Sequence, residues 1–136
     1  MISCDTHIRI AYADTDPMGF VYYGNYPTFY ERGRTELIRS VGMSYRQMED
    51  MGIMMPVRSL SAEYIKPARY DDLIRIRTIV SELPTARMNF NYEIFNEENE
   101  LLHKAFTCLI FLDSIKRKPV KVPDFLLHKL MPFFEN

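Results

Sequence analysis

The sequence predicts an α+β fold in which a curved antiparallel sheet wraps around one long central helix. Apolar residues in segment 25–41 recur at steps of three and four, the period of an amphipathic helix. After position 57 the apolar residues instead alternate at a period of two, which indicates strands. The turns between these strands are short and favour antiparallel hairpins. Because the apolar stripe of one helix needs a sheet face to cover it, the α+β class follows.

The expected elements follow one another along the chain. A short strand at 6–12 is followed by a loop rich in glycine and proline and then by the long helix at 25–41. A shorter helix is expected at 44–51, where Ser44 and Gln47 have the spacing of a capping box. The meander that follows has its expected strands at 57–66, 73–80, 88–95 and 101–112. Asp124 is expected to cap a final helix that ends near residue 130.

The long helix carries the largest apolar stripe of the chain. The residues of this stripe are Tyr26, Phe29, Tyr30, Gly33, Leu37 and Val41. Asn25 is a suitable N-cap, because its side chain can accept a hydrogen bond from a free amide. Charged residues, Arg34 among them, are expected on the flanks of the helix. Gly33 costs about 1 kcal/mol relative to alanine in a helix, so we expect a neighbouring surface to approach the backbone closely there.

Composition limits the class of protein. The chain of 136 residues suits one domain, and no repeat or linker divides 1–136. A net charge of -1 gives no overall attraction to nucleic acid or to an anionic membrane. Apolar runs are too short to span a bilayer and the amino-terminal residues lack a signal-peptide pattern, so a cytoplasmic location is expected. Cys4 and Cys108 are far apart, which favours a reducing compartment over a disulfide framework.

Residues 12–26 carry the main functional signal. They read YADTDPMGFVYYGNY, and residues 29–36 continue as FYERGRTE. This pattern resembles the 4-hydroxybenzoyl-CoA thioesterase family of hotdog-fold proteins, and within it the bacterial acyl-CoA thioesterases of the Tol-Pal-associated branch. The likeness extends through 57–58, 63–72 and 113–119 and so covers nearly the whole chain. It implies a hotdog fold and hydrolysis of an acyl-CoA thioester to free acid and CoA, with no metal or redox cofactor.

The resemblance also assigns catalytic roles. Asp16 matches the catalytic carboxylate of the family, which acts as a nucleophile or as a general base toward water; both roles need an ionised carboxylate near the thioester carbon. The family places the backbone N–H matching Tyr23 on the thioester oxygen, where the helix start offers free N–H groups and a positive dipole end. Gly24 and Asn25 are candidate substrate contacts, with a helix cap as the alternative for Asn25. On spacing alone, Asp16 is a loop aspartate that caps a turn.

Coenzyme A and a second subunit are the partners that the resemblance implies. Hotdog proteins form homodimers or homotetramers with the site between subunits, and the partner is expected to contribute Val57, Arg58 and Ser59. Arginine and lysine suit the phosphates of coenzyme A. The candidates for this contact are Arg87, Lys116, Arg117 and Lys118, for which a solvated basic turn is the alternative. High aromatic content, 13%, and a net charge near zero also favour self-association.

Other functions stay open at this point. One alternative is another hotdog enzyme that acts on a thioester, either a thioesterase for acyl-carrier-protein substrates or a dehydratase. A dehydratase would usually require a histidine near the carboxylate. Another is a non-catalytic acyl-CoA-binding or regulatory module, or a scaffold in an envelope complex. His7, His103 and His128 lie outside any nucleophile motif, and the sequence lacks a metal cluster or a GxSxG elbow. An α/β-hydrolase type of thioesterase is therefore excluded, and the acyl group is not readable.

Overall fold

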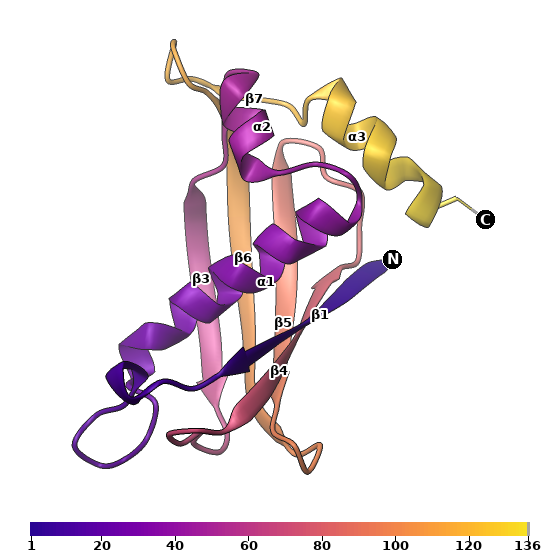
Figure 1. Ribbon diagram of the computed structural model, residues 1–136. Coiled ribbons are helices and arrows are strands. Elements are labelled where there is room, and N and C mark those ends of the chain that lie inside the picture. The colour runs from indigo at the N-terminus through magenta and orange to yellow at the C-terminus, as the bar shows by residue number, and fades with distance from the viewer. Residues whose placement is uncertain (136) are drawn as a thin grey trace.

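One antiparallel sheet packs against the long helix (Figure 1), and the computed structural model describes residues 1–135 of the chain. The sheet in this part of the chain has seven strands: β1 (Ile2–Arg9), β2 (Ile53–Met54), β3 (Val57–Tyr64), β4 (Leu73–Val80), β5 (Arg87–Phe95), β6 (Leu101–Asp113) and β7 (Pro119–Val120). The α-helices are α1 (Tyr26–Ser40), α2 (Tyr45–Asp50) and α3 (Asp124–Leu130). Single 3-10 turns occur at η1 (Tyr12–Asp14), η2 (Tyr23–Asn25) and η3 (Met131–Phe133).

The order of the strands leaves β3 at an edge of the sheet. The path runs β1-β4-β5-β6, and every pairing along it is antiparallel. β6 pairs with β5 along one side and with β3 and β2 along the other, so the long strand lies inside the sheet as its apolar sequence predicts. Within residues 1–135, β3 has no strand partner on its outer side. The open curved sheet around one helix confirms the predicted fold class.

The period-two pattern identified the buried face of the central strands correctly. Ile74, Ile76 and Val80 of β4 are fully buried, as are the alternating apolar residues of β5. On β3 the outcome differs, because Leu60 and Tyr64 stay 46% and 53% exposed. The helix packs mainly over β1, β4 and β5, and it also meets β3 where Tyr26 packs against Tyr64 at the end of that strand. Much of the inner side of this edge strand is therefore open in the single chain.

The stripe of α1 is buried as predicted, and Gly33 explains how closely the helix approaches the sheet. A Cβ atom at Gly33 would collide with Oγ1 of Thr78 and would lie 3.3 Å from Cγ2 of Ile76, both on β4. Because glycine has no side chain, the helix backbone packs directly on β4 at this position, and this packing offsets the low helix propensity of glycine. Val41 is only half-buried, and Ile38 is buried in addition to the predicted residues.

Arg34 was wrongly expected on a charged flank of α1. Its side chain is 8% exposed, and its Nη1 donates a hydrogen bond to the hydroxyl of Tyr92 at 3.4 Å. Position 34 lies four residues after Tyr30 and so belongs to the buried side of the helix. The long aliphatic stem of arginine allows the residue to cross the apolar layer and reach polar partners.

Of the three capping predictions, that for α2 is confirmed, that for Asn25 is right in position but not in its side-chain contact, and that for Asp124 is wrong. Asn25 occupies the cap position of α1, but the one-turn helix η2 precedes α1 and the side chain of Asn25 instead donates to the carbonyl of Asp14 at 2.8 Å. Asp124 is the first residue inside α3, whose cap position is Pro123. The capping box of α2 is present, since Ser44 Oγ accepts from the Gln47 amide at 3.1 Å and the amide of Ser44 donates to Gln47 Oε1 at 2.9 Å.

The first strand is longer at its start than the sequence suggested. It begins at Ile2 and pairs with the whole of β4, whereas Tyr12 lies in η1. Ile2 and Cys4 alternate with Ser3 and Asp5 in this extension, so the period of two continues to the start of the strand. In the part of the chain that the structure describes, no helix is long and apolar enough to cross a membrane.

Candidate active site

The loop between β1 and α1 places Asp16 near the amino-terminal end of the long helix. Two isolated β-bridges hold this loop, one between Thr15 and Val21 and the other between Phe20 and Arg69. Between them the chain makes a tight turn, in which the amide of Gly19 donates to the carbonyl of Asp16 at 2.9 Å. Gly19 has φ +82°, a conformation that favours glycine. In Figure 1 this loop is the wide turn at the lower left, beside the end of β3.

The carboxylate of Asp16 is held in one orientation by backbone amides. Its Oδ1 accepts a hydrogen bond from the Met18 amide at 2.9 Å and a longer one from the Phe20 amide at 3.4 Å. This is the turn-capping contact that an aspartate before proline often makes. Among residues 1–135, Oδ2 accepts no hydrogen bond and remains available to another group. The residue therefore caps the turn and also exposes a carboxylate oxygen.

Asp16 lines a cavity of about 350 Å³. The walls come from the motif loop, the first turn of α1 and the end of β3, and they are mainly apolar and aromatic. Tyr23 lies in this wall together with Asp16. Lys66, the other charged residue of the lining, forms an ion pair with Glu100. Because that lysine already has a carboxylate partner, Asp16 is the unpaired charge of the cavity lining.

Tyr26 and Tyr64 line one side of the cavity, with the buried His103 packed against both. The ring of His103 stacks on Tyr26 with centroids 4.1 Å apart, and Tyr64 meets His103 edge-on at 4.7 Å. Burial lowers the pKa of His103 from 6.5 to about 4, so the imidazole is neutral at pH 7. Burial also raises the pKa of the Tyr26 and Tyr64 hydroxyls, which stay protonated. The two tyrosines line the cavity and separate His103 from it.

The start of η2 contributes Tyr23 to the same cavity lining as Asp16. Tyr23 and Gly24 are the first residues of η2, and the first amides of a helical segment have no acceptor within the helix. The carbonyl of Asp14 accepts from the Tyr22 amide at 2.9 Å and from the Asn25 side chain, which fixes the turn on one side. η2 runs directly into α1, whose dipole adds positive potential at this end.

The remaining predicted residues lie at the opposite end of the sheet. Val57 begins β3 and Tyr64 ends it, so roughly 23 Å separates them at the rise of an extended strand. Val57 and Arg87 pair with the adjacent residues Leu109 and Ile110 of β6. Arg58 and Ser59 follow Val57 on β3, and all of these are exposed. A single chain therefore does not bring them to Asp16.

Arg87 lines a different cavity, of about 450 Å³, on the face of the sheet that points away from α1. Asn89 and Asn91 of the same strand share this lining. The predicted basic cluster, Lys116, Arg117 and Lys118, lies in the hairpin between β6 and β7 and is exposed.

The hairpin is shaped by Asp113, which ends β6. Its carboxylate accepts from the amides of Lys116 at 2.8 Å and Ile115 at 3.0 Å, and these hydrogen bonds lower the pKa of Asp113. Arg117 has φ +57° at the tip of the turn. The basic side chains of the hairpin therefore project from a turn with a defined backbone.

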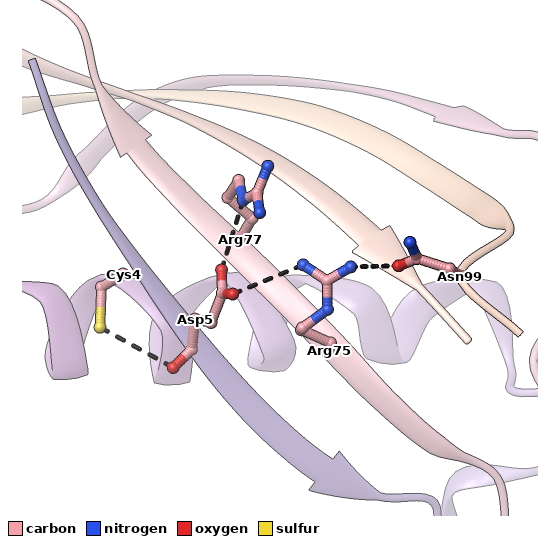
Figure 2. Close-up of polar contacts among 5 residues, drawn as sticks. All are labelled: Cys4, Asp5, Arg75, Arg77 and Asn99. Carbon is pink, nitrogen blue, oxygen red and sulfur yellow. Dashed lines mark hydrogen bonds and ion pairs between the residues drawn. The ribbon is translucent and has the colours of Figure 1, made fainter. Parts of the chain in front are cut away.

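Other arginines of the outer sheet face already have partners (Figure 2). Asp5 on β1 accepts from Arg75 and Arg77 on β4, each at 3.4 Å. Arg75 also donates to the side chain of Asn99 and lies over the ring of Phe95, 4.4 Å from its centroid. These arginines hold the β1–β4 edge together and are less available to a phosphate than Arg87.

The comparison with known families decides what kind of protein this is. The model of the thioesterase-like superfamily matches residues 10–130. The chain belongs to this family. It is 36% identical over 116 residues to the acyl-CoA thioester hydrolase YbgC of Escherichia coli, covering 85% of this chain and 87% of that protein. It is 35% identical to the putative acyl-CoA thioesterase YneP of Bacillus subtilis, covering 84% of this chain and 83% of the relative.

Solved structures of the family agree with this assignment. A DHNA-CoA thioesterase from Staphylococcus aureus superposes with a TM-score of 0.88 at 34% identity, covering all of this chain and 97% of the neighbour. A 4-hydroxybenzoyl-CoA thioesterase superposes with a TM-score of 0.83, covering 93% of this chain and 97% of the neighbour; at 23% identity it supports the fold alone. The predicted family, hotdog fold and thioesterase class of enzyme are thereby confirmed.

Proposed function

We propose that this protein hydrolyses an acyl-CoA thioester to a free carboxylic acid and CoA, with Asp16 as its catalytic carboxylate. The observation that carries the proposal is the shared cavity of Asp16 and Tyr23, one bearing an exposed carboxylate oxygen and the other a backbone N–H at a helix start. Hydrolysis of a thioester needs these two groups on either side of one carbonyl. The reaction requires no metal or redox cofactor, and a cytoplasmic location suits an acyl-CoA substrate.

The proposed chemistry uses Oδ2 of Asp16. Either this oxygen attacks the thioester carbon itself, or it removes a proton from a water molecule that attacks. Negative charge then develops on the thioester oxygen, where the Tyr23 N–H donates a hydrogen bond. One such fixed donor is typically worth about 3–4 kcal/mol. The carbon–sulfur bond then breaks and CoA leaves as the thiolate. In the general-base route the thiolate takes up the proton that Asp16 removed from water, and the acid is released directly. In the nucleophilic route the acyl group is first left as an anhydride on Oδ2, and a water molecule hydrolyses this anhydride, which releases the acid, restores the carboxylate and supplies the proton for the thiolate.

The free edge of β3 supports a site shared between two copies of the chain. If a second copy pairs with β3 in antiparallel fashion, the two strands run in opposite directions. The end of one strand, Tyr64, then lies beside the start of the other, the partner subunit's Val57. The cavity that contains Asp16 would so be completed by the 57–59 segment of the partner, as the family resemblance implies. The unpaired N–H and C=O groups along the free edge of β3 would be satisfied at the same time.

The same geometry would bring the basic end of the partner's sheet toward this cavity. Arg87, with Asn89 and Asn91 in a polar cavity, is the best-shaped candidate for the phosphates of coenzyme A. The exposed hairpin with Lys116, Arg117 and Lys118 would add positive charge at the same end. Gly24 and Asn25, at the helix start, would contact the thioester end of the substrate.

A panel of short, long and aromatic acyl-CoAs, assayed by release of the free thiol, tests the proposal. We expect Asp16→Asn to lower kcat/KM for the best substrate by about 10³-fold or more while CoA binding, measured by calorimetry, is kept. Asp124→Asn, in the exposed first turn of α3, is the matched control and should retain activity. A wild-type protein that cleaves none of the panel, or an Asp16→Asn variant of full activity, would refute the proposal. Acyl-carrier-protein thioesters, assayed in parallel, distinguish the alternative carrier.

A further inference from the structure

We infer that Tyr64 is a positioning residue, whose hydroxyl group holds the backbone turn that binds the oxyanion. Tyr64 is the last residue of the edge strand β3, and its hydroxyl donates a hydrogen bond to the carbonyl oxygen of Tyr23 at 2.9 Å. This bond ties the edge of the sheet to the first residue of η2. The inference rests on the proposed function, because it concerns the donor that would act on the thioester.

Aromatic contacts hold the ring of Tyr64 in place independently of the hydrogen bond that its hydroxyl makes. Its centroid lies 5.2 Å from that of Tyr26 and 4.7 Å from that of His103, and it is nearly perpendicular to both. Since Tyr26 and His103 are themselves stacked 4.1 Å apart, the similar distances place Tyr64 beside the pair and not on top of it. His103 is in turn anchored by a hydrogen bond with Tyr30. The hydroxyl is therefore presented from a rigid aromatic block.

The carbonyl of Tyr23, which accepts this hydrogen bond, lies next to the backbone N–H groups of Tyr23 and Gly24 and so affects their orientation. The C=O of Tyr23 and the N–H of Gly24 belong to one planar peptide group. Holding this carbonyl fixes the peptide plane that directly follows the Tyr23 amide. The carbonyl of Asp14 holds the other side of the turn through Tyr22 and Asn25. With both sides tied, the Tyr23 N–H keeps a constant position relative to Asp16.

Burial alone does not explain this hydrogen bond. Tyr64 is 53% exposed, so water could satisfy its hydroxyl without cost. Its partner is nevertheless a specific backbone carbonyl 41 positions away in the sequence. The bond therefore serves the geometry of the turn. A misplacement of a reacting group by about 1 Å can lower a rate by about 10²-fold.

Replacement of Tyr64 by phenylalanine tests the inference, because it keeps the ring and removes only the hydroxyl. We expect Tyr64→Phe to lower kcat by about ten- to a hundredfold with KM within about twofold of wild type, the pattern of a group that acts on the transition state. Tyr70→Phe is a matched control, since Tyr70 is 52% exposed and its ring is paired with that of Tyr12 outside the cavity. An unchanged kcat in Tyr64→Phe, or a rise in KM alone, would overturn the inference.

A second measurement reports on the turn without any turnover. The chain has 5 glycines, so ¹⁵N-glycine labelling gives a simple amide spectrum. Loss of the hydrogen bond at the Tyr23 carbonyl should shift the Gly24 amide resonance in Tyr64→Phe and leave it in place in Tyr70→Phe. A Gly24 resonance that does not move overturns the inference even if activity falls. A shift of the Gly24 resonance with unchanged kcat also overturns the inference about Tyr64 but leaves the proposed hydrolysis intact. An inactive wild-type protein would instead overturn both the proposed function and the inference about Tyr64.

Discussion

Tyr30 of α1 and His103 of β6 share a hydrogen bond between the phenol oxygen and Nε2, 73 positions apart in the chain. Both side chains are buried, and Nδ1 of the imidazole has no partner among residues 1–135. The fold therefore keeps a neutral histidine behind the cavity, where it supports Tyr26 and Tyr64. Its role is structural, and a pH dependence of stability follows.

The free energy of unfolding should fall as the pH is lowered through the window between 6.5 and about 4. Unfolded His103 takes up a proton near pH 6.5, whereas the folded protein resists protonation until about pH 4, so acid favours the unfolded state. The loss amounts to at most about 3 kcal/mol once the pH is below both values. Urea unfolding at several pH values measures it. His103→Gln should lack this component and His7→Gln, on an exposed position, should keep it; identical slopes in all three proteins would contradict the prediction.

Gly33→Ala should destabilise the protein, although alanine is the better helix former. The new methyl group would collide with Oγ1 of Thr78, which is fully buried and cannot turn away freely. We expect a net loss of roughly 1–2 kcal/mol from overpacking, measured by thermal or urea unfolding. Since Oγ1 of Thr78 has no hydrogen-bond partner among residues 1–135, Thr78→Ala removes the obstacle at little cost. The double variant should recover most of the loss; if the two effects simply add, this account of Gly33 is wrong.

If two copies pair through β3 as proposed, a charge on this edge strand should separate them and lower activity at the same time. Leu60 lies in the middle of β3 and is 46% exposed, and lysine on an edge strand opposes pairing. We expect Leu60→Lys to sediment as a monomer and to lose about tenfold or more of its kcat/KM, because each cavity loses the partner's contribution. Met51→Lys changes another exposed apolar residue, 54% exposed and outside the sheet, and serves as the control. A monomeric Leu60→Lys with full activity would show that one chain suffices.

Local patterns were enough to predict most of the fold. The helix stripe and the alternation on β4 and β5 are properties of neighbouring residues, and the structure buries both as expected. The close approach at Gly33 could also be predicted, because a glycine on a buried stripe has a cost that packing must offset. For Asp16 and Tyr23, periodicity gave no signal, and the motif resemblance placed them in one cavity.

Residues whose environment depends on distant parts of the chain could not be predicted. The sequence predicts Arg34 as a surface cation, because it does not show that Tyr92, 58 positions away, accepts a hydrogen bond from the buried guanidinium group. Asn25 fits the rule for a cap, but η2 places its side chain on Asp14 instead. The alternation in the strand at 57–66 places Tyr64 on the inner face, but it does not show that the hydroxyl of Tyr64 donates to the carbonyl of Tyr23, 41 positions away. In each case the sequence shows the residue type but not the partner.

β3 is only eight residues long, and its two ends lie at different places in the proposed assembly. In a paired protein each copy of this strand would serve two reaction centres, its own through Tyr64 and its neighbour's through Val57. A ligand that shifts this strand at one reaction centre would therefore change the position of the strand at the other centre. Turnover measured against substrate concentration should then deviate from a simple hyperbola, with a Hill coefficient that differs from unity.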